Sequence, residues 1–183
     1  MSAPPLNGGT AADMVTSSKA GIRRYKVDQG STGFYNGVEA RTFKEWETAT
    51  TGTYVIKAVV PIDIILTAIE LQIETGTIRM ETVAGGTPGG VFAETLPVFR
   101  ANNMSVAPAY TPTVVLTAGG THTGGTLLDV LRVKADLNSN RSASVGDSQG
   151  SERGIAPGAY HFRLTLDGVI GTLKMRWEDF IPG

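Results

Sequence analysis

A short motif in the last quarter of the chain has the spacing of a hydrolase nucleophile. Gly146-Asp-Ser-Gln-Gly150 matches the Gly-x-Ser-x-Gly pattern, in which a sharp turn from a strand into a helix exposes a serine, here Ser148. The residues before it are polar instead of an apolar strand, no helical pattern follows, and no acid is placed to orient His161, the one histidine behind it. Turns also require glycine and small polar residues, so we interpret the motif as an exposed loop and predict no catalytic residue.

The two histidines are the next candidates for chemistry. His122 is at the centre of the palindrome Gly119-Gly-Thr-His-Thr-Gly-Gly125, and His161 lies at a polar position of a strand pattern. A zinc site needs three or four ligands, and neither histidine has a second histidine or a carboxylate at a useful short spacing. We predict loop or surface histidines that make ordinary hydrogen bonds, with no metal and no cofactor; a histidine on the symmetry axis of an oligomer would be the exception.

Two further patterns have a possible chemistry and a simpler structural interpretation. Gly85-Gly-Thr-Pro-Gly-Gly90 could suggest a phosphate loop, but no Lys-Ser or Lys-Thr follows it and no helix begins there, so a wide turn is expected. Glu70, Glu74 and Glu81 could form a carboxylate cluster for acid-base catalysis. They occupy the alternating polar positions of a strand pattern, which predicts a solvated face.

Composition limits the classes of function. At 183 residues the chain suits one domain, or one domain with an appended arm. Because 16 basic and 17 acidic side chains are scattered along the whole length, we expect no nucleic-acid partner. No run of about 18 apolar residues occurs and the first residues lack the pattern of a secretory signal, so we expect no membrane partner. The absence of cysteine excludes disulfides and a thiol nucleophile.

Residues 69–82 carry the clearest structural pattern. Apolar and polar residues alternate on both sides of Thr75-Gly76, which is the period of a half-buried strand, and glycine permits the positive φ of a tight turn. We therefore predict a hairpin that turns at these two residues. The predicted cross-strand neighbours are Ile73 with Ile78 and Leu71 with Met80 on the core face, and Gln72 with Arg79 on the solvent face.

A second hairpin is predicted near the C-terminal end. Residues 160–166 and 173–178 alternate between apolar and polar in the same way. The connection between them runs from Asp167 to Gly171 and contains the Asp-Gly pair that tight turns favour. Together the two hairpins predict a sheet with one buried face.

The rest of the chain adds shorter strands and two long connections. A strand is expected over residues 54–60, ended by Pro61, and another over 127–134, where a helical turn is the alternative and β-branched residues favour the strand. Residues 84–113 and 138–154 are expected to be a long irregular connection and an exposed loop. Seven to nine strands by this reading predict an all-β fold, an antiparallel β-sandwich of the jelly-roll kind.

The first forty residues differ from the rest. They show little periodicity, are rich in Ser, Thr, Gly and Ala, and have no core of their own. We interpret residues 1–40 as an extended N-terminal arm that is ordered by docking on another chain, and residues 41–183 as the β-sandwich domain. The arm's predicted interaction residues are Ile22, Tyr25, Phe34 and Tyr35.

Several turn and core motifs resemble those of small virion structural proteins of tailed bacteriophages. The resemblance covers roughly residues 41–180 and is carried by Arg41-Thr-Phe-Lys-Glu-Trp, Val83-Ala-Gly-Gly-Thr-Pro-Gly-Gly-Val-Phe, Thr95-Leu-Pro-Val-Phe-Arg-Ala-Asn-Asn-Met, Tyr110-Thr-Pro, Gly119-Gly-Thr-His-Thr-Gly-Gly-Thr, Glu152-Arg-Gly and Arg176-Trp-Glu. It implies a non-enzymatic particle component. Cement or decoration proteins with jelly-roll cores, commonly trimers on the capsid, are the version that we favour.

These observations predict a capsid cement or decoration protein that is not an enzyme. It would form a homo-oligomer, with a trimer favoured, and stabilise the shell through its arm and its sandwich surfaces. Its partners would be the major capsid protein or other virion proteins, and its location the virion, at the capsid surface. The alternatives are a tail or head-fibre component that binds the host surface or a neighbouring tail protein through the long loops, and a small hydrolase built on Ser148.

Overall fold

The computed structural model describes residues 39–100, 111–135 and 154–179 in full, and the backbone alone of residues 15–19, 22–26, 143–146 and Arg153. These parts of the chain contain strands and no helix, so the all-β prediction is confirmed. No helix in them could span a membrane. The strands are β1 (Val15–Lys19), β2 (Ile22–Lys26), β3 (Glu39–Val60), β4 (Ile64–Ala84), β5 (Thr87–Gly89), β6 (Glu94–Thr95), β7 (Val98–Arg100), β8 (Val115–Ala118), β9 (Thr121–Thr123), β10 (Thr126–Lys134), β11 (Ala143–Gly146), β12 (Arg153–Ile155) and β13 (Gly158–Asp179).

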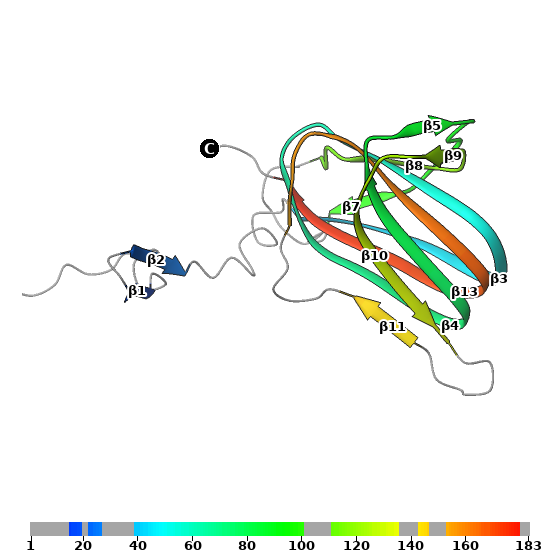
Figure 1. The fold of residues 1–183 in the computed structure, drawn as a ribbon, viewed down its shortest axis with the longest axis horizontal. Helices are drawn as coiled ribbons and strands as arrows, with labels where there is room; N and C mark the ends of the chain where they lie inside the picture. Colours follow the sequence, from blue (N-terminus) through cyan, green and yellow to red (C-terminus); the bar gives the residue numbers. More distant parts are fainter. Residues whose placement is uncertain are drawn as a thin grey trace, which may run out of the picture.

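Three long strands form the centre of the sheet. β3, β4 and β13 have 22, 21 and 22 residues, and β13 lies between the other two, antiparallel to both. Each bends near its middle, so the sheet curls over on itself, with the bend at the lower right of Figure 1. We name the two parts as follows. Half-sheet A contains residues 39–50, 64–75 and 169–179, and half-sheet B contains residues 52–60, 76–84 and 158–168.

Shorter strands extend each half-sheet at its edges. In half-sheet A, β11 and β12 pair with β4, and β7 pairs with β3. In half-sheet B, β10 pairs with β4, β8 with β3, and β6 with β8. β1 pairs with β2, and β5 with β9, in separate two-stranded sheets. Among the described strands, β10 and β6 are therefore the outermost strands of half-sheet B.

The bend between the half-sheets is built at a glycine and at β-bulges. Gly76 in β4 has a φ of +83°, and a Cβ there would collide with the carbonyl oxygens of Asp167 and Gly168 in β13. The pairing of β13 with both neighbours shifts register within residues 166–171. Thr75 Oγ1 donates a hydrogen bond of 2.9 Å to the Gly168 carbonyl oxygen across this point. The extra residues let each strand turn a corner without losing its neighbours.

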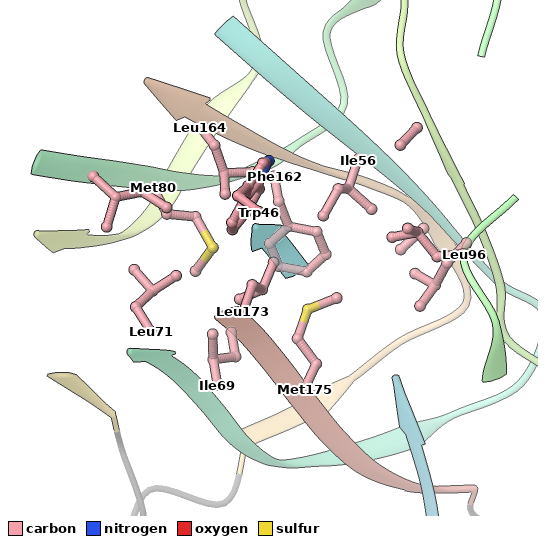
Figure 2. Packing of buried hydrophobic residues seen from close by; sticks show 14 of the residues in the cluster. Trp46, Ile56, Ile69, Leu71, Met80, Leu96, Phe162, Leu164, Leu173 and Met175 are labelled. Atoms are coloured by element: carbon pink, nitrogen blue, oxygen red, sulfur yellow. The ribbon is translucent and has the colours of Figure 1, made fainter. Parts of the chain in front are cut away.

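Apolar side chains on the inner faces of the two half-sheets form one core, which Figure 2 shows. Leu71 and Leu173 belong to half-sheet A, and Met80 and Leu164 to half-sheet B; each is at most 1% exposed. Burying one such side chain contributes about 1.5–3 kcal/mol. This shared core holds the two half-sheets against each other.

The two predicted hairpins are wrong, although the predicted faces are right. β4 and β13 each run through the predicted turn as one strand, so the members of the pairs Ile73–Ile78 and Leu71–Met80 lie on opposite sides of the bend in the same strand instead of facing each other across a hairpin. All four are buried, and the predicted solvent residues of the same segment are exposed. The Thr-Gly signal marks a bulged bend because β13 pairs with β4 on both sides of it.

Several predicted connections also contain strands. Residues 84–113 hold β5, β6 and β7, and residues 138–154 hold β11 and part of β12. These strands have two to four residues each, too short for an alternating pattern to be recognised. The predicted strand over residues 127–134 is confirmed as part of β10, and β3 ends at Val60, directly before Pro61 as expected.

The predicted arm is described only in part. Ile22 and Tyr25 lie in β2, of which the structure describes the backbone alone. Phe34, Tyr35 and Ser148 lie outside the described residues. The arm and its four interaction residues therefore stay predictions.

Candidate functional site

The two histidines, far apart in the sequence, lie face to face in the structure. The centroids of the His122 and His161 rings are 3.9 Å apart, and the ring planes differ by 19°. His161 is 2% exposed and His122 is 7% exposed. The prediction of two separate loop or surface histidines is therefore wrong, because the fold stacks them on each other and buries both.

The central strands of half-sheet B position His161. It lies in β13 at an outer position, on the face of half-sheet B directed away from the core, because its neighbour Phe162 belongs to the core on the inner face. Its Cα partners are Lys57 in β3 and Val83 in β4. His161 thus lies in the middle of three paired strands, where an uncovered side chain would contact solvent.

A short ribbon made by the two glycine-rich tracts brings His122 onto His161. β5 from the first tract pairs with β9 from the second, with Pro88 opposite His122. At Gly86 a Cβ would lie only 2.5 Å from His122 Nε2, so the close approach of the ribbon to the ring requires glycine. The tract predicted as a wide turn is therefore one strand of a lid over the outer face, which we call the β5–β9 ribbon.

Three further contacts surround the stacked rings. The Phe92 ring lies 6.2 Å from that of His161, measured between centroids. Lys57 Nζ lies 6.0 Å from the Phe92 centroid, in a cation-π arrangement. Beside the ribbon, the backbone amide of Gly119 donates a hydrogen bond of 3.0 Å to the Val55 carbonyl oxygen of β3. The histidine pair is thus enclosed by an aromatic ring, a cation and backbone.

Most of the ring nitrogens are without hydrogen-bond partners. His122 Nε2 donates to the Gly85 carbonyl oxygen at 2.9 Å, which fixes the proton of the neutral ring on Nε2 because a carbonyl only accepts. His122 Nδ1 and both nitrogens of His161 are buried and have no partner in the described part of the chain. Buried polar atoms of this kind are rare in folded proteins, so the arrangement requires an explanation.

The surroundings favour uncharged imidazole. Burial, the neighbouring His122 and the charge on Lys57, in that order, lower the pKa of His161 to about 4. Desolvation penalises the imidazolium form, and a second cation close by adds to that penalty. His161 is accordingly neutral at physiological pH, with one ring N–H that reaches no acceptor.

Glu81, a carboxylate on the outer face of half-sheet B, is already paired. Glu81 binds Arg163 at 2.7 Å and Arg79 at 2.6 Å. Arg163 also donates to the Gly124 carbonyl oxygen at 3.4 Å, next to the ribbon. Neither Glu81 nor any other described carboxylate forms a hydrogen bond or ion pair with the histidine rings. No described anion is therefore in place to stabilise a protonated pair.

This geometry restricts the chemistry of the pair. Lone pairs of imidazole lie in the ring plane, and two rings stacked almost parallel cannot direct them at one metal ion. The described residues also contain no group of three or more histidine, aspartate or glutamate side chains that could hold a metal. Burial of both rings prevents proton exchange with a bound substrate. What remains is a buried, stacked pair of imidazole rings.

The other predicted candidates do not come together. Glu70 lies in half-sheet A, where Arg176 Nη2 approaches it at 3.4 Å, whereas Glu81 lies in half-sheet B. Glu74 lies in β4 near the bend, so the three glutamates are spread along one long strand. Glu74 is exposed, as expected for a solvated face, whereas Glu70 and Glu81 are half-buried and paired with arginines.

A small cavity lies between the half-sheets, at the end away from the bend. It has a volume of about 40 Å³ and an apolar lining that includes Leu66, Phe162, Met175 and Trp177. Binding pockets for small molecules usually have about 300–1,000 Å³. The cavity is therefore much smaller than a typical pocket for a small molecule.

Apolar side chains are exposed at two places on half-sheet B. On the edge strand β10, Leu127, Leu128 and Val130 are 51%, 48% and 41% exposed. On β3 and β8, the Cα partners Val59 and Val115 are 40% and 53% exposed. Neighbouring exposed side chains of this size are the usual mark of a protein-binding surface.

The contact between His122 and His161 was not predicted, because the pairing of the two glycine-rich tracts cannot be inferred from either tract alone. One signal was available: His122 is flanked on both sides by small residues, which indicates a backbone that closely approaches something large.

Comparison with known proteins adds no candidate, because no family model, no curated protein and no solved structure matches the chain.

Proposed function

We propose that this chain is a non-enzymatic structural protein of a tailed-bacteriophage virion, a cement or decoration protein that binds neighbouring subunits at the capsid surface. In this proposal the curled sheet is a jelly-roll-like sandwich, residues 1–40 are an arm that reaches another subunit, and the working form is a homo-oligomer, with a trimer favoured. The motifs that resemble small virion proteins supply the class of particle. The surface of half-sheet B supports the mode of action.

The observation that carries the proposal is the exposed apolar edge of half-sheet B. β10 has three exposed apolar side chains, Leu127, Leu128 and Val130, within four residues. No described strand pairs with the free side of β10. An edge strand usually avoids such a composition, because apolar edges promote association with other chains. In an assembly with copies of itself or with a shell protein, this chain would bury this apolar edge.

Other exposed apolar side chains are consistent with a protein that acts by binding other proteins. Val59 and Val115 add apolar area on the opposite side of half-sheet B. At about 25 cal/mol per Å² of buried apolar area, several hundred Å² per contact would contribute substantially, although the entropic cost of association offsets much of it. Many weak contacts on a rigid shell would act together through avidity.

Deleting residues 1–38, which leaves β3 complete, tests the proposal most directly. The full chain and the deletion variant are mixed with shells assembled from the major capsid protein of the same particle, and binding and resistance of the shells to heat are measured. We expect the full chain to bind and protect, and the deletion variant to bind much more weakly. Undiminished attachment of the variant would contradict the role of the arm.

A second experiment tests the edge. Leu128→Lys places a charge on the exposed edge, and Thr126→Lys, on the same strand, is the matched control for added charge. Sedimentation is expected to show a smaller species for the Leu128 variant than for the full chain and the control. An unchanged mass for all three proteins would exclude the β10 edge from the assembly.

One observation favours the tail or head-fibre alternative. Phe43 and Phe99 are stacked with their ring centroids 5.9 Å apart and are 43% and 40% exposed. Exposed aromatic rings are the side chains that a carbohydrate-binding surface would use. Of the other aromatic residues between positions 84 and 113, Phe92 lies against His161 and Tyr110 lies outside the described residues. Binding of host-surface glycans that Phe43→Ala abolishes would favour this alternative.

A further inference from the structure

The β5–β9 ribbon contacts the main sheet through the histidine stack. It forms a two-stranded sheet of its own, with three residues in each strand. Its contacts with half-sheet B include the stack of His122 on His161, the hydrogen bond of Gly119 to Val55, and the longer hydrogen bond of Arg163 to Gly124. A change in the histidine stack therefore acts on a packing contact between the ribbon and the sheet.

The charged groups around the stack provide no free counter-ion for a protonated imidazole. From β3 comes Lys57, the Cα partner of His161. From β4 comes Glu81, which is already bound by Arg79 and by Arg163 of β13. β5 and β8 contain no titratable residue, and β9 contains His122 alone. A proton on either ring would thus be added beside a lysine and next to the second imidazole, without an anion to balance it.

We propose that the His122–His161 stack is an acid-sensitive latch: its neutral form holds the β5–β9 ribbon on the outer face of half-sheet B, and protonation releases the ribbon. Once the ribbon opens, the His161 imidazole contacts water and takes up a proton freely. Opening also uncovers Val55 and Val83, which are 1% and 0% exposed in the closed form. Acid therefore changes the outer surface of half-sheet B without unfolding the core. This inference goes beyond the proposed function and does not depend on it.

The low pKa of His161, caused by burial and by its two neighbours, supports the same direction. An open ribbon binds a proton that the closed ribbon excludes in the range between the pKa of a free imidazole, about 6.5, and that of the closed state. In this range the equilibrium constant for opening rises about tenfold per pH unit for each proton taken up.

Hydrogen exchange of the full-length protein tests the latch. The protection factors of backbone amides in residues 87–89 and 121–123 are measured between pH 7 and pH 4, corrected for the intrinsic pH dependence of exchange. We expect protection of the ribbon to fall about tenfold per pH unit below about pH 6, as His161 takes up a proton in the open state. Amides of the core strands, such as those of Leu71 and Leu164, are the internal reference and are expected to stay protected.

Two variants separate titration from packing. His161→Phe keeps a flat ring in the stack and removes both titratable nitrogens, and we expect its ribbon to lose most of the acid dependence. His122→Phe is the second variant, in case the first does not fold, and is expected to act in the same direction. Lys57→Met removes a neighbouring charge but keeps the latch, so its acid dependence is expected to remain. Equal ribbon protection of the unsubstituted protein at pH 7 and pH 4, or full acid dependence in both phenylalanine variants, would overturn the proposal.

Discussion

The two buried regions of this molecule are built on opposite principles. The core between the half-sheets is apolar, and residues such as Leu71 and Leu164 are fully buried without polar atoms that need partners. The histidine site on the outer face is buried almost as well, yet three of its four ring nitrogens have no partner in the described part of the chain. The first region stabilises the fold at any pH, whereas the second stabilises its ribbon only while His161 is neutral.

The comparison shows which part of this fold has a stability that depends on pH. Hydrophobic burial does not depend on a titratable group, so the strands that define the sheet are insensitive to mild acid. Burial makes the charged form of an imidazole unfavourable, so the folded state loses stability as the pH falls. Because the buried imidazoles lie under a ribbon of two short strands, the response to acid is confined to a small part of the molecule.

The largest effect is expected from the core. Leu164→Ala removes a fully buried side chain and leaves a cavity, which should lower the free energy of unfolding by about 2–5 kcal/mol. The loss should be the same at pH 7 and pH 5, measured by urea denaturation. Thr165→Ala, at the next and exposed position of β13, is the control and should change little. A strongly pH-dependent loss in the leucine variant would remove the distinction between the two regions.

Acidification should show the next largest effect. The unfolded chain has a histidine pKa of about 6.5, and burial, His122 and Lys57 lower that of folded His161 to about 4. The stabilisation by neutral His161 is thus complete above about pH 6.5 and falls as the pH approaches 4, by about 3 kcal/mol in total at 1.36 kcal/mol per unit. The measurement is the difference in unfolding free energy between the unsubstituted protein and His161→Phe across this range.

That difference has to be taken between the two proteins, because other groups titrate in the opposite sense. Burial raises the pKa of Glu39 and of Asp179, so these carboxyl groups favour the folded state as the pH falls. Their contribution is common to both proteins and cancels. A constant difference from pH 7 to pH 4 would contradict the role of His161.

A smaller effect is expected from the ribbon itself. Gly86→Ala puts a Cβ at 2.5 Å from His122 Nε2 and adds backbone strain at a φ of +87°, so it should destabilise the ribbon by about 1–3 kcal/mol. Gly124→Ala has similar strain, at a φ of +69°, but meets no atom within 4 Å, and is the matched control. Hydrogen exchange of the ribbon at pH 7 measures both. Equal effects of the two substitutions would show that the approach to His122 is not critical.

The smallest effect should come from the ion pairs beside the ribbon. Arg163 and Glu81 are partly exposed, so Arg163→Gln should cost less than about 1 kcal/mol, and less still in high salt. Arg79→Gln removes a bond to the same carboxylate without touching the Gly124 carbonyl oxygen, and separates the two contributions. A loss of several kcal/mol for Arg163→Gln would mean that the arginine, and not the histidine stack, holds the ribbon.

The sequence predicted the faces of this sheet better than its path. Alternation along β4 and β13 correctly assigned the inner residues, since side chains of a strand alternate whatever its partners are. It could not distinguish a hairpin turn from a bulged bend at Thr75-Gly76, because both need a residue with positive φ. The choice depends on β13, a strand more than 80 residues further along the chain.

The candidate site was harder to predict for a related reason. His122 and His161 meet only because β9 pairs with β5 and the resulting ribbon lies over β13. No local spacing encodes that contact, and the partners of a three-residue strand cannot be inferred from its composition. The Gly-rich flanks of His122 indicated a close approach, but not what is approached.

An NMR titration of the two histidine rings tests the latch most directly. In the full-length protein at 25 °C, the carbon-bound ring protons of each histidine are followed from pH 8 to pH 4, together with the exchange of the ribbon amides. We predict that His161 stays neutral down to about pH 4 while the ribbon is closed, and that any earlier protonation coincides with loss of ribbon protection. A normal titration of His161 near pH 6.5 with the ribbon still protected would contradict the latch.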